Sequence, residues 1–124
     1  MHVKAERIEE DIENLARFNA TPGEGITRYS YSTEDGEARE YLGDKMREAG
    51  LAVRTDPVGN MFARLEGSRP DLAPVMSGSH IDTVHHGGKY DGVVGTVCAL
   101  EALRAIREEG NTPIRPLEMI VFVE

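Results

Sequence analysis

Apolar residues recur with a helical period in three parts of the chain. They predict an amphipathic helix over residues 4–18, with acidic residues on its other side, a second helix ending at Gly50 and a third over residues 92–109. Ser32 is a suitable N-cap for the second helix, because Asp35 follows three residues later. The positions expected to be buried are Ile8, Ile12 and Leu15 in the first helix, Ala38, Tyr41, Leu42 and Met46 in the second, and Val94, Val97, Cys98, Leu100, Leu103 and Ile106 in the third.

Short apolar runs between these helices predict strands. Residues 51–54 and 61–65 flank a Pro-Val-Gly-Asn turn and indicate a hairpin. Residues 75–79 form a third strand, and residues 117–123, rich in β-branched side chains, form a fourth. Strands that alternate with helices are typical of an α/β layered domain. No repeat, linker or low-complexity tract interrupts the chain, so one domain without an internal boundary is expected.

Composition narrows the class of protein. The 124 residues carry 22 acidic and 14 basic side chains, a net charge of −8, and no basic patch, which argues against a nucleic-acid partner. The acidic N-terminal region is not typical of a signal peptide, and no apolar run approaches the length of a membrane span. The single cysteine, Cys98, excludes an intrachain disulfide and is expected to pack among apolar neighbours. A cytoplasmic setting is the expectation.

One stretch has the residue types of a metal site. His80 stands at the end of the strand predicted over residues 75–79, Asp82 follows two residues later, and Asp91 lies within a glycine-rich run. Imidazole and carboxylate groups are ligands for Zn²⁺ and neighbouring divalent ions. The glycines allow the backbone to bring the second ligand back towards the first. The spacing alone also fits a hydrogen-bonded strand-end histidine, an Asp82 side chain in a local turn and an Asp91 that caps the third helix.

Residues 77–95, SGSHIDTVHHGGKYDGVVG, resemble the metal-site segment of the hydantoinase/carbamoylase family of amidohydrolases. That family includes N-carbamoyl-L-amino-acid hydrolases and allantoate amidohydrolases, within a larger superfamily of di-metal aminoacylases and exopeptidases. The HxDTV and GGxYDG motifs are specific. Other stretches that agree with the family are residues 25–28, 31–32, 56–61 and 116–124.

The resemblance implies a fold and an activity. The expected fold is part of a di-zinc-aminopeptidase-like three-layer α/β catalytic domain, of which residues 1–124 are the N-terminal portion, truncated after an apolar strand. The implied reaction is the hydrolysis of a linear C–N bond in a small ureido or N-carbamoyl compound, with two divalent ions (Zn, or Mn, Co or Ni) as cofactors. The resemblance also implies a homodimer formed through a region absent from this chain, and neither a nucleic-acid nor a membrane partner.

The family pattern assigns roles to particular residues. His80 and Asp91 match metal ligands, with Asp91 as the carboxylate that bridges two ions, and Asp82 matches the catalytically important aspartate that supports the histidine. Glu124 matches either the catalytic base or, as the spacing from Asp91 favours, the acid just before it.

Some features leave the class of function open. His85 and His86 depart from the family pattern and are interpreted as loop residues, although two imidazoles near a metal site can also bind metal adventitiously. An aminoacylase or peptidase of the same superfamily is the alternative enzyme. An inactive folded fragment or a binding module is the alternative of a different class.

Overall fold

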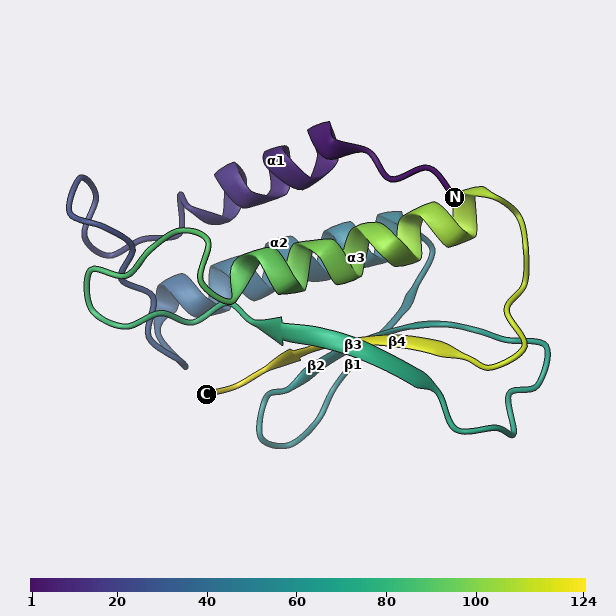
Figure 1. The fold of residues 1–124 in the computed structure, drawn as a ribbon. Coiled ribbons are helices and arrows are strands. Elements are labelled where there is room, and N and C mark those ends of the chain that lie inside the picture. Colours follow the sequence, from purple (N-terminus) through teal and green to yellow (C-terminus); the bar gives the residue numbers. More distant parts are fainter.

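The chain folds into three helices and four strands, seen in a computed structural model that describes residues 1–124 (Figure 1). Two helices come first along the chain, followed by three strands, a third helix and a fourth strand. The elements are α1 (Ala5–Leu15), α2 (Thr33–Glu48), β1 (Ala52–Thr55), β2 (Met61–Leu65), β3 (Val75–His80), α3 (Val93–Glu108) and β4 (Leu117–Phe122).

The four strands form one mixed sheet with the order β1-β2-β4-β3. β1 and β2 form the predicted hairpin, with Thr55 opposite Met61, and β2 pairs antiparallel with β4. β3 and β4 are parallel, with His80 opposite Phe122, and α3 connects them. Because the two parallel strands run the same way, their carboxyl ends meet at one edge of the sheet, where α3 begins.

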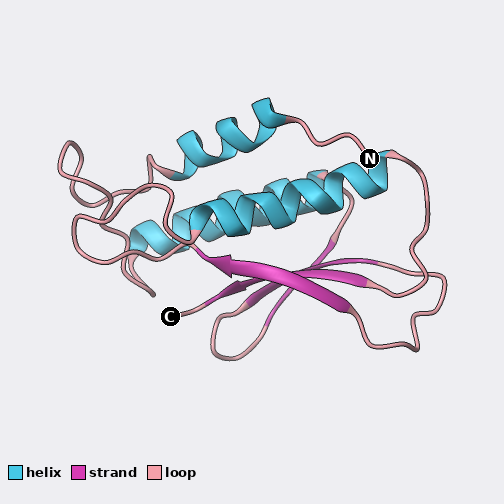
Figure 2. Cartoon of the chain, viewed as in Figure 1, coloured by secondary structure: helices cyan, strands magenta, loops and turns pink.

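All three helices lie on the same side of the sheet (Figure 2). α3 packs against β3 and β4, and α1 packs on α3. The core between the layers holds buried apolar side chains such as Leu42, Val97 and Met119. The α/β class is thus confirmed, and two of the three expected layers lie within these residues. No helix is both long and apolar enough to span a membrane.

Local chemistry explains most helix boundaries and some errors of prediction. The Ser32 hydroxyl accepts a hydrogen bond from the Asp35 amide at 3.1 Å, which confirms the predicted N-cap. In α3, however, Val94 and Cys98 are exposed, because the buried face is formed by Val93, Val97, Leu100 and Leu103 instead. A helix that is apolar nearly all round does not reveal which stripe faces the core.

Candidate metal centre

Four acidic and imidazole side chains converge at the carboxyl ends of β3 and β4. His80 is the last residue of β3, and Glu124 lies two residues beyond β4. Asp82 and Asp91 come from the loop that leads from β3 into α3. The parallel pairing of β3 with β4 therefore brings together residues that are 44 positions apart in sequence, His80 and Glu124 (124 minus 80).

The orientation of the His80 ring leaves one nitrogen free. Its Nδ1 lies 2.9 Å from the backbone carbonyl oxygen of Asp82, so we assign the proton to Nδ1. Nε2 then carries the lone pair, and it lies 3.8 Å from Asp91 Oδ2 and 3.6 Å from Glu124 Oε2. Metal-bound histidines commonly donate their other N–H to a carbonyl or carboxylate in this way, which fixes the tautomer and the ring orientation.

The Asp82 carboxylate lies on the Nδ1 side of the His80 ring, with its Oδ1 atom 3.7 Å from Nδ1. Asp82 is 8% exposed, and its Oδ1 atom is buried without any hydrogen-bond partner. A buried carboxylate oxygen without a donor is costly, and structures seldom contain one without a reason. One potential ligand atom from each of His80, Asp82 and Glu124 lies within 4.8 Å of the others. This set of imidazole and carboxylate donors suits a divalent cation.

Gly92 makes the close approach of α3 to His80 possible. It has a left-handed φ of 71°, and a Cβ atom at this position would lie 2.5 Å from His80 Cε1. Gly92 is also the N-cap residue of α3, and no side chain caps this helix end. The capping role considered for Asp91 is therefore absent. The Asp91 side chain is 82% exposed and its Oδ2 faces the His80 ring.

A buried arginine supports the histidine–aspartate loop and was not identified from the sequence. Arg28 is 1% exposed and donates through Nε to the carbonyl of Ile81, between His80 and Asp82, at 2.8 Å. Its Nη1 also donates to the carbonyls at the end of α1, those of Leu15 and Phe18. Burial lowers the pKa of Arg28, while the charges of Asp35 and Asp82 raise it. Arg28 thus ties the loop to α1.

His85 and His86, which depart from the family pattern, lie next to each other and outside this cluster. Their rings stack at 3.7 Å between centroids, and the His85 ring stacks on Tyr29 at 6.4 Å. His86 Nε2 lies 3.8 Å from Glu24 Oε2. Neither ring joins His80, Asp82 and Glu124 in the group of potential ligand atoms. Their position agrees with the interpretation as loop residues.

Comparison with known proteins identifies the kind of protein to which this site belongs. No family model matches the chain. An N-carbamoyl-L-amino-acid amidohydrolase of Paenarthrobacter aurescens is 47% identical over 121 residues, which is 98% of this chain and 29% of the relative. A ureidoglycolate hydrolase of Oryza sativa subsp. japonica is 44% identical over 98% of this chain and 25% of its own length.

Solved structures give the same result. A hydantoinase/carbamoylase family amidase from Burkholderia ambifaria superposes with a TM-score of 0.92 at 36% identity, over 97% of this chain and 30% of its own. The aminopeptidase PepT from Bacillus cereus shares the fold, with a TM-score of 0.73 at 20% identity over 98% of this chain and 37% of its own. Residues 1–124 are therefore similar in sequence and fold to hydantoinase/carbamoylase family amidases, and the chain spans about 29% of the length of such relatives.

Proposed function

We propose that residues 1–124 form the metal-binding portion of an amidohydrolase that cleaves a linear C–N bond in a small ureido or N-carbamoyl compound. The proposal draws on relatives named for such substrates, which include N-carbamoyl-L-amino acids, ureidoglycolate and allantoate. Which of these compounds the protein prefers depends on pocket residues, most of which this chain does not supply.

One observation of the site carries the proposal. His80 Nε2, the assigned acceptor nitrogen, faces the carboxylates of Asp91 and Glu124 with no lysine or arginine paired to either one. Carboxylates that gather around a neutral imidazole repel one another unless a cation lies between them. We propose His80 and Asp91 as ligands, with Asp91 shared by two divalent ions as in the family it resembles. Zn²⁺ is the expected ion, and Mn²⁺, Co²⁺ and Ni²⁺ suit the same donor set.

The bound ions would supply Lewis-acid activation of water and of the substrate carbonyl. The residues of this chain would hold and orient that centre. The backbone carbonyl of Asp82 accepts the His80 Nδ1 proton and so keeps Nε2 available as an acceptor. The Asp82 side chain contributes the negative charge behind the histidine, and its catalytic importance in this role is part of the proposal.

Glu124 contributes a carboxylate from the end of β4, on the Nε2 side of the His80 ring. Its Oε2 atom lies 3.6 Å from His80 Nε2, and a carboxylate is a suitable general base. The sequence spacing favoured Glu124 as the residue before the catalytic base. One of its carboxylate oxygens lies within 4.8 Å of potential ligand atoms of His80 and Asp82, which is compatible with either assignment.

Ammonia release tests the proposed activity. The full-length protein, loaded with Zn²⁺, Mn²⁺ or Co²⁺, is assayed with N-carbamoyl-L-amino acids, allantoate and ureidoglycolate, before and after chelation. We expect turnover of at least one ureido compound that chelator removes and metal restores. Dipeptides and N-acyl amino acids in the same panel test the aminoacylase or peptidase alternative. Turnover of none of these compounds by protein with bound metal would support the inactive or binding-module alternative and contradict the proposal.

A further inference from the structure

The backbone immediately before the Glu124 side chain is held by side chains from three separate parts of the chain. These groups bind backbone atoms of three consecutive residues, and two of the three hydrogen bonds are to the peptide unit between Phe122 and Val123. The hydrogen bonds run from Arg39 Nη2 to the Phe122 carbonyl (3.2 Å), from the Val123 amide to Asn60 Oδ1 (2.8 Å), and from the Ser30 hydroxyl to the Glu124 carbonyl (2.6 Å).

Asn60 is the one of the three that accepts a hydrogen bond from this backbone, and its amide is oriented by Asp56. Asp56 Oδ1 accepts hydrogen bonds from the backbone amides of the hairpin turn at 2.9 to 3.0 Å, including that of Asn60. Asp56 Oδ2 accepts the side-chain Nδ2 of Asn60 at 2.9 Å. Because Nδ2 is directed to Asp56, the Asn60 oxygen must point the other way, towards the Val123 amide.

Gly59 lets this turn come close to the end of β4. Its φ is 110°, and a Cβ there would lie 3.2 Å from Val123 Cγ2. Its carbonyl also accepts a hydrogen bond from Arg39 Nη1 at 2.8 Å, so the same arginine binds the turn and the strand end. The turn between β1 and β2 is thus built against β4, and its geometry is not explained by hairpin closure alone.

We propose that Asn60, held by Asp56, is a positioning residue that sets the place of the Glu124 carboxylate relative to His80. The Val123 amide that Asn60 binds belongs to the residue directly before Glu124. A shift of about 1 Å in a catalytic group can reduce turnover by about 10²-fold. The importance of this positioning for metal binding rests on the function proposed above, whereas the positioning itself is a property of the chain.

Substitutions in the full-length protein separate positioning from general stability. Asn60→Ala removes the acceptor for the Val123 amide. Val53→Ala is the matched control, because Val53 lies in the same hairpin and packs on the core without contacting the end of β4. We expect Asn60→Ala to speed hydrogen exchange of the Val123 amide at least about 10-fold and to weaken Zn²⁺ binding by about 10–100-fold. Val53→Ala should lower the melting temperature but leave the Val123 exchange rate and the Zn²⁺ affinity unchanged.

Exchanging the side chains at positions 56 and 60 tests whether the contact that Asn60→Asp loses can be restored. Asn60→Asp alone removes the donor to Asp56 and sets two carboxylates against each other. Adding Asp56→Asn restores a donor, since the new amide can donate to the new carboxylate while that carboxylate still accepts the Val123 amide. The double variant should recover the slow Val123 exchange and most of the metal affinity that Asn60→Asp loses.

The outcomes distinguish this inference from the proposed function. Val123 exchange and metal affinity in Asn60→Ala that match those of Val53→Ala would overturn the positioning role, as would a double variant no better than Asn60→Asp. If the unsubstituted protein binds no divalent metal, the proposed function fails. The Val123 exchange rates, measured without metal, still decide whether Asn60 holds the strand end.

Discussion

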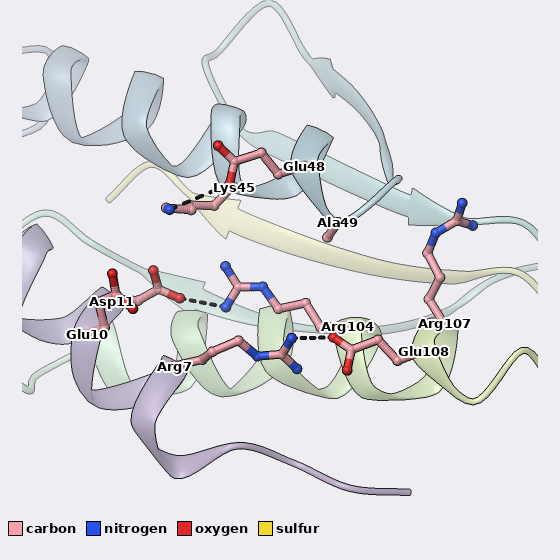
Figure 3. Close-up of a pocket in the computed structure, with 9 residues that line it drawn as sticks. All are labelled: Arg7, Glu10, Asp11, Lys45, Glu48, Ala49, Arg104, Arg107 and Glu108. Atoms are coloured by element: carbon pink, nitrogen blue, oxygen red, sulfur yellow. Dashed lines mark hydrogen bonds and ion pairs between the residues drawn. The ribbon is translucent and has the colours of Figure 1, made fainter.

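Two charged clusters lie at opposite ends of the helical layer, and they are built differently. A pocket of about 490 Å³ opens between α1 and the carboxyl-terminal ends of α2 and α3 (Figure 3). There the buried Arg104 donates to Asp11 at 2.6 Å, and Arg7 pairs with Glu101 and Glu108. At the strand ends, by contrast, no lysine or arginine forms an ion pair with Asp82, Asp91 or Glu124, although the charge of Asp82 acts on the buried Arg28.

The contrast indicates what each cluster is for. Burying a charge is tolerated when an opposite charge and hydrogen bonds accompany it, and the helical pocket meets that condition with its own residues. The strand-end cluster does not, since Asp82 retains an unpartnered oxygen and His80 Nε2 has only carboxylates before it. The helical pocket balances its charges with its own residues, whereas the strand-end cluster gathers carboxylates that a divalent cation would neutralise under the proposed function. The helical pocket and the strand-end cluster should therefore respond differently to substitution.

The largest effect should come from His80. His80→Ala in the full-length protein removes the imidazole that stands between the carboxylates, and we expect loss of bound metal and of ammonia release below detection. The melting temperature of the metal-free protein is measured as well, because the His80 ring lies against Gly92 at the start of α3. Metal analysis and turnover on the same preparation check both. Retained activity with bound metal would show that the strand-end cluster is not the metal site.

A substitution in the helical pocket should lower the stability of the protein and leave its metal affinity nearly unchanged. Asp11→Ala leaves the buried Arg104 guanidinium without its 2.6 Å partner, and breaking such a pair costs about 3–5 kcal/mol of unfolding free energy. Metal affinity should stay within about twofold, since the pocket lies at the far end of α3. Denaturant unfolding and a competitive zinc titration measure the two quantities. A large loss of metal affinity without destabilisation would mean that the clusters are not independent.

Asp82→Asn should give a smaller effect at the strand ends. The amide keeps the shape of the side chain and removes its charge, while the backbone carbonyl that binds His80 Nδ1 remains. We expect metal affinity to fall by about 10–100-fold, as for other groups that support a ligand. The metal-free protein should be as stable as the parent or more so, because a buried unpartnered carboxylate oxygen is removed. Destabilisation of the metal-free protein would indicate a structural role instead.

The smallest effect concerns Tyr41, whose hydroxyl donates to Asp11 at 2.6 Å. Burial, together with the hydrogen bond to Asp11, raises the pKa of Tyr41 from 10 to about 12. A raised folded-state pKa means that this contribution to stability is complete below pH 10 and is lost as the pH rises towards 12. Unfolding of the protein and of Tyr41→Phe between pH 9 and 12 should differ in slope. Identical slopes would contradict the assignment.

The sequence predicted some levels of this structure better than others. The helices and strands follow from local periodicity and from caps such as Ser32, which need only neighbouring residues. His80, Asp82 and Asp91 were found because their motif is short and continuous. Their assignment as ligands and as supporting group stays a prediction until metal is measured.

What the sequence did not reveal depends on contacts between distant segments. Arg28 lies in an irregular stretch, and its support of the Ile81 carbonyl exists only because β3 ends beside α1. The place of Glu124 depends on the register of β4 against β3, which spacing from Asp91 does not contain. The sequence predicted acidic residues on the polar side of the first helix, yet Asp11 is 3% exposed, because Arg104 of α3 reaches it.

Anomalous X-ray diffraction at the zinc edge, from crystals of the full-length protein grown with Zn²⁺, tests the central claim most directly. The account predicts anomalous density about 2.0–2.2 Å from His80 Nε2 and from an oxygen of Asp91, at the carboxyl ends of β3 and β4. Density at the stacked His85 and His86 rings, with none beside His80, would contradict it.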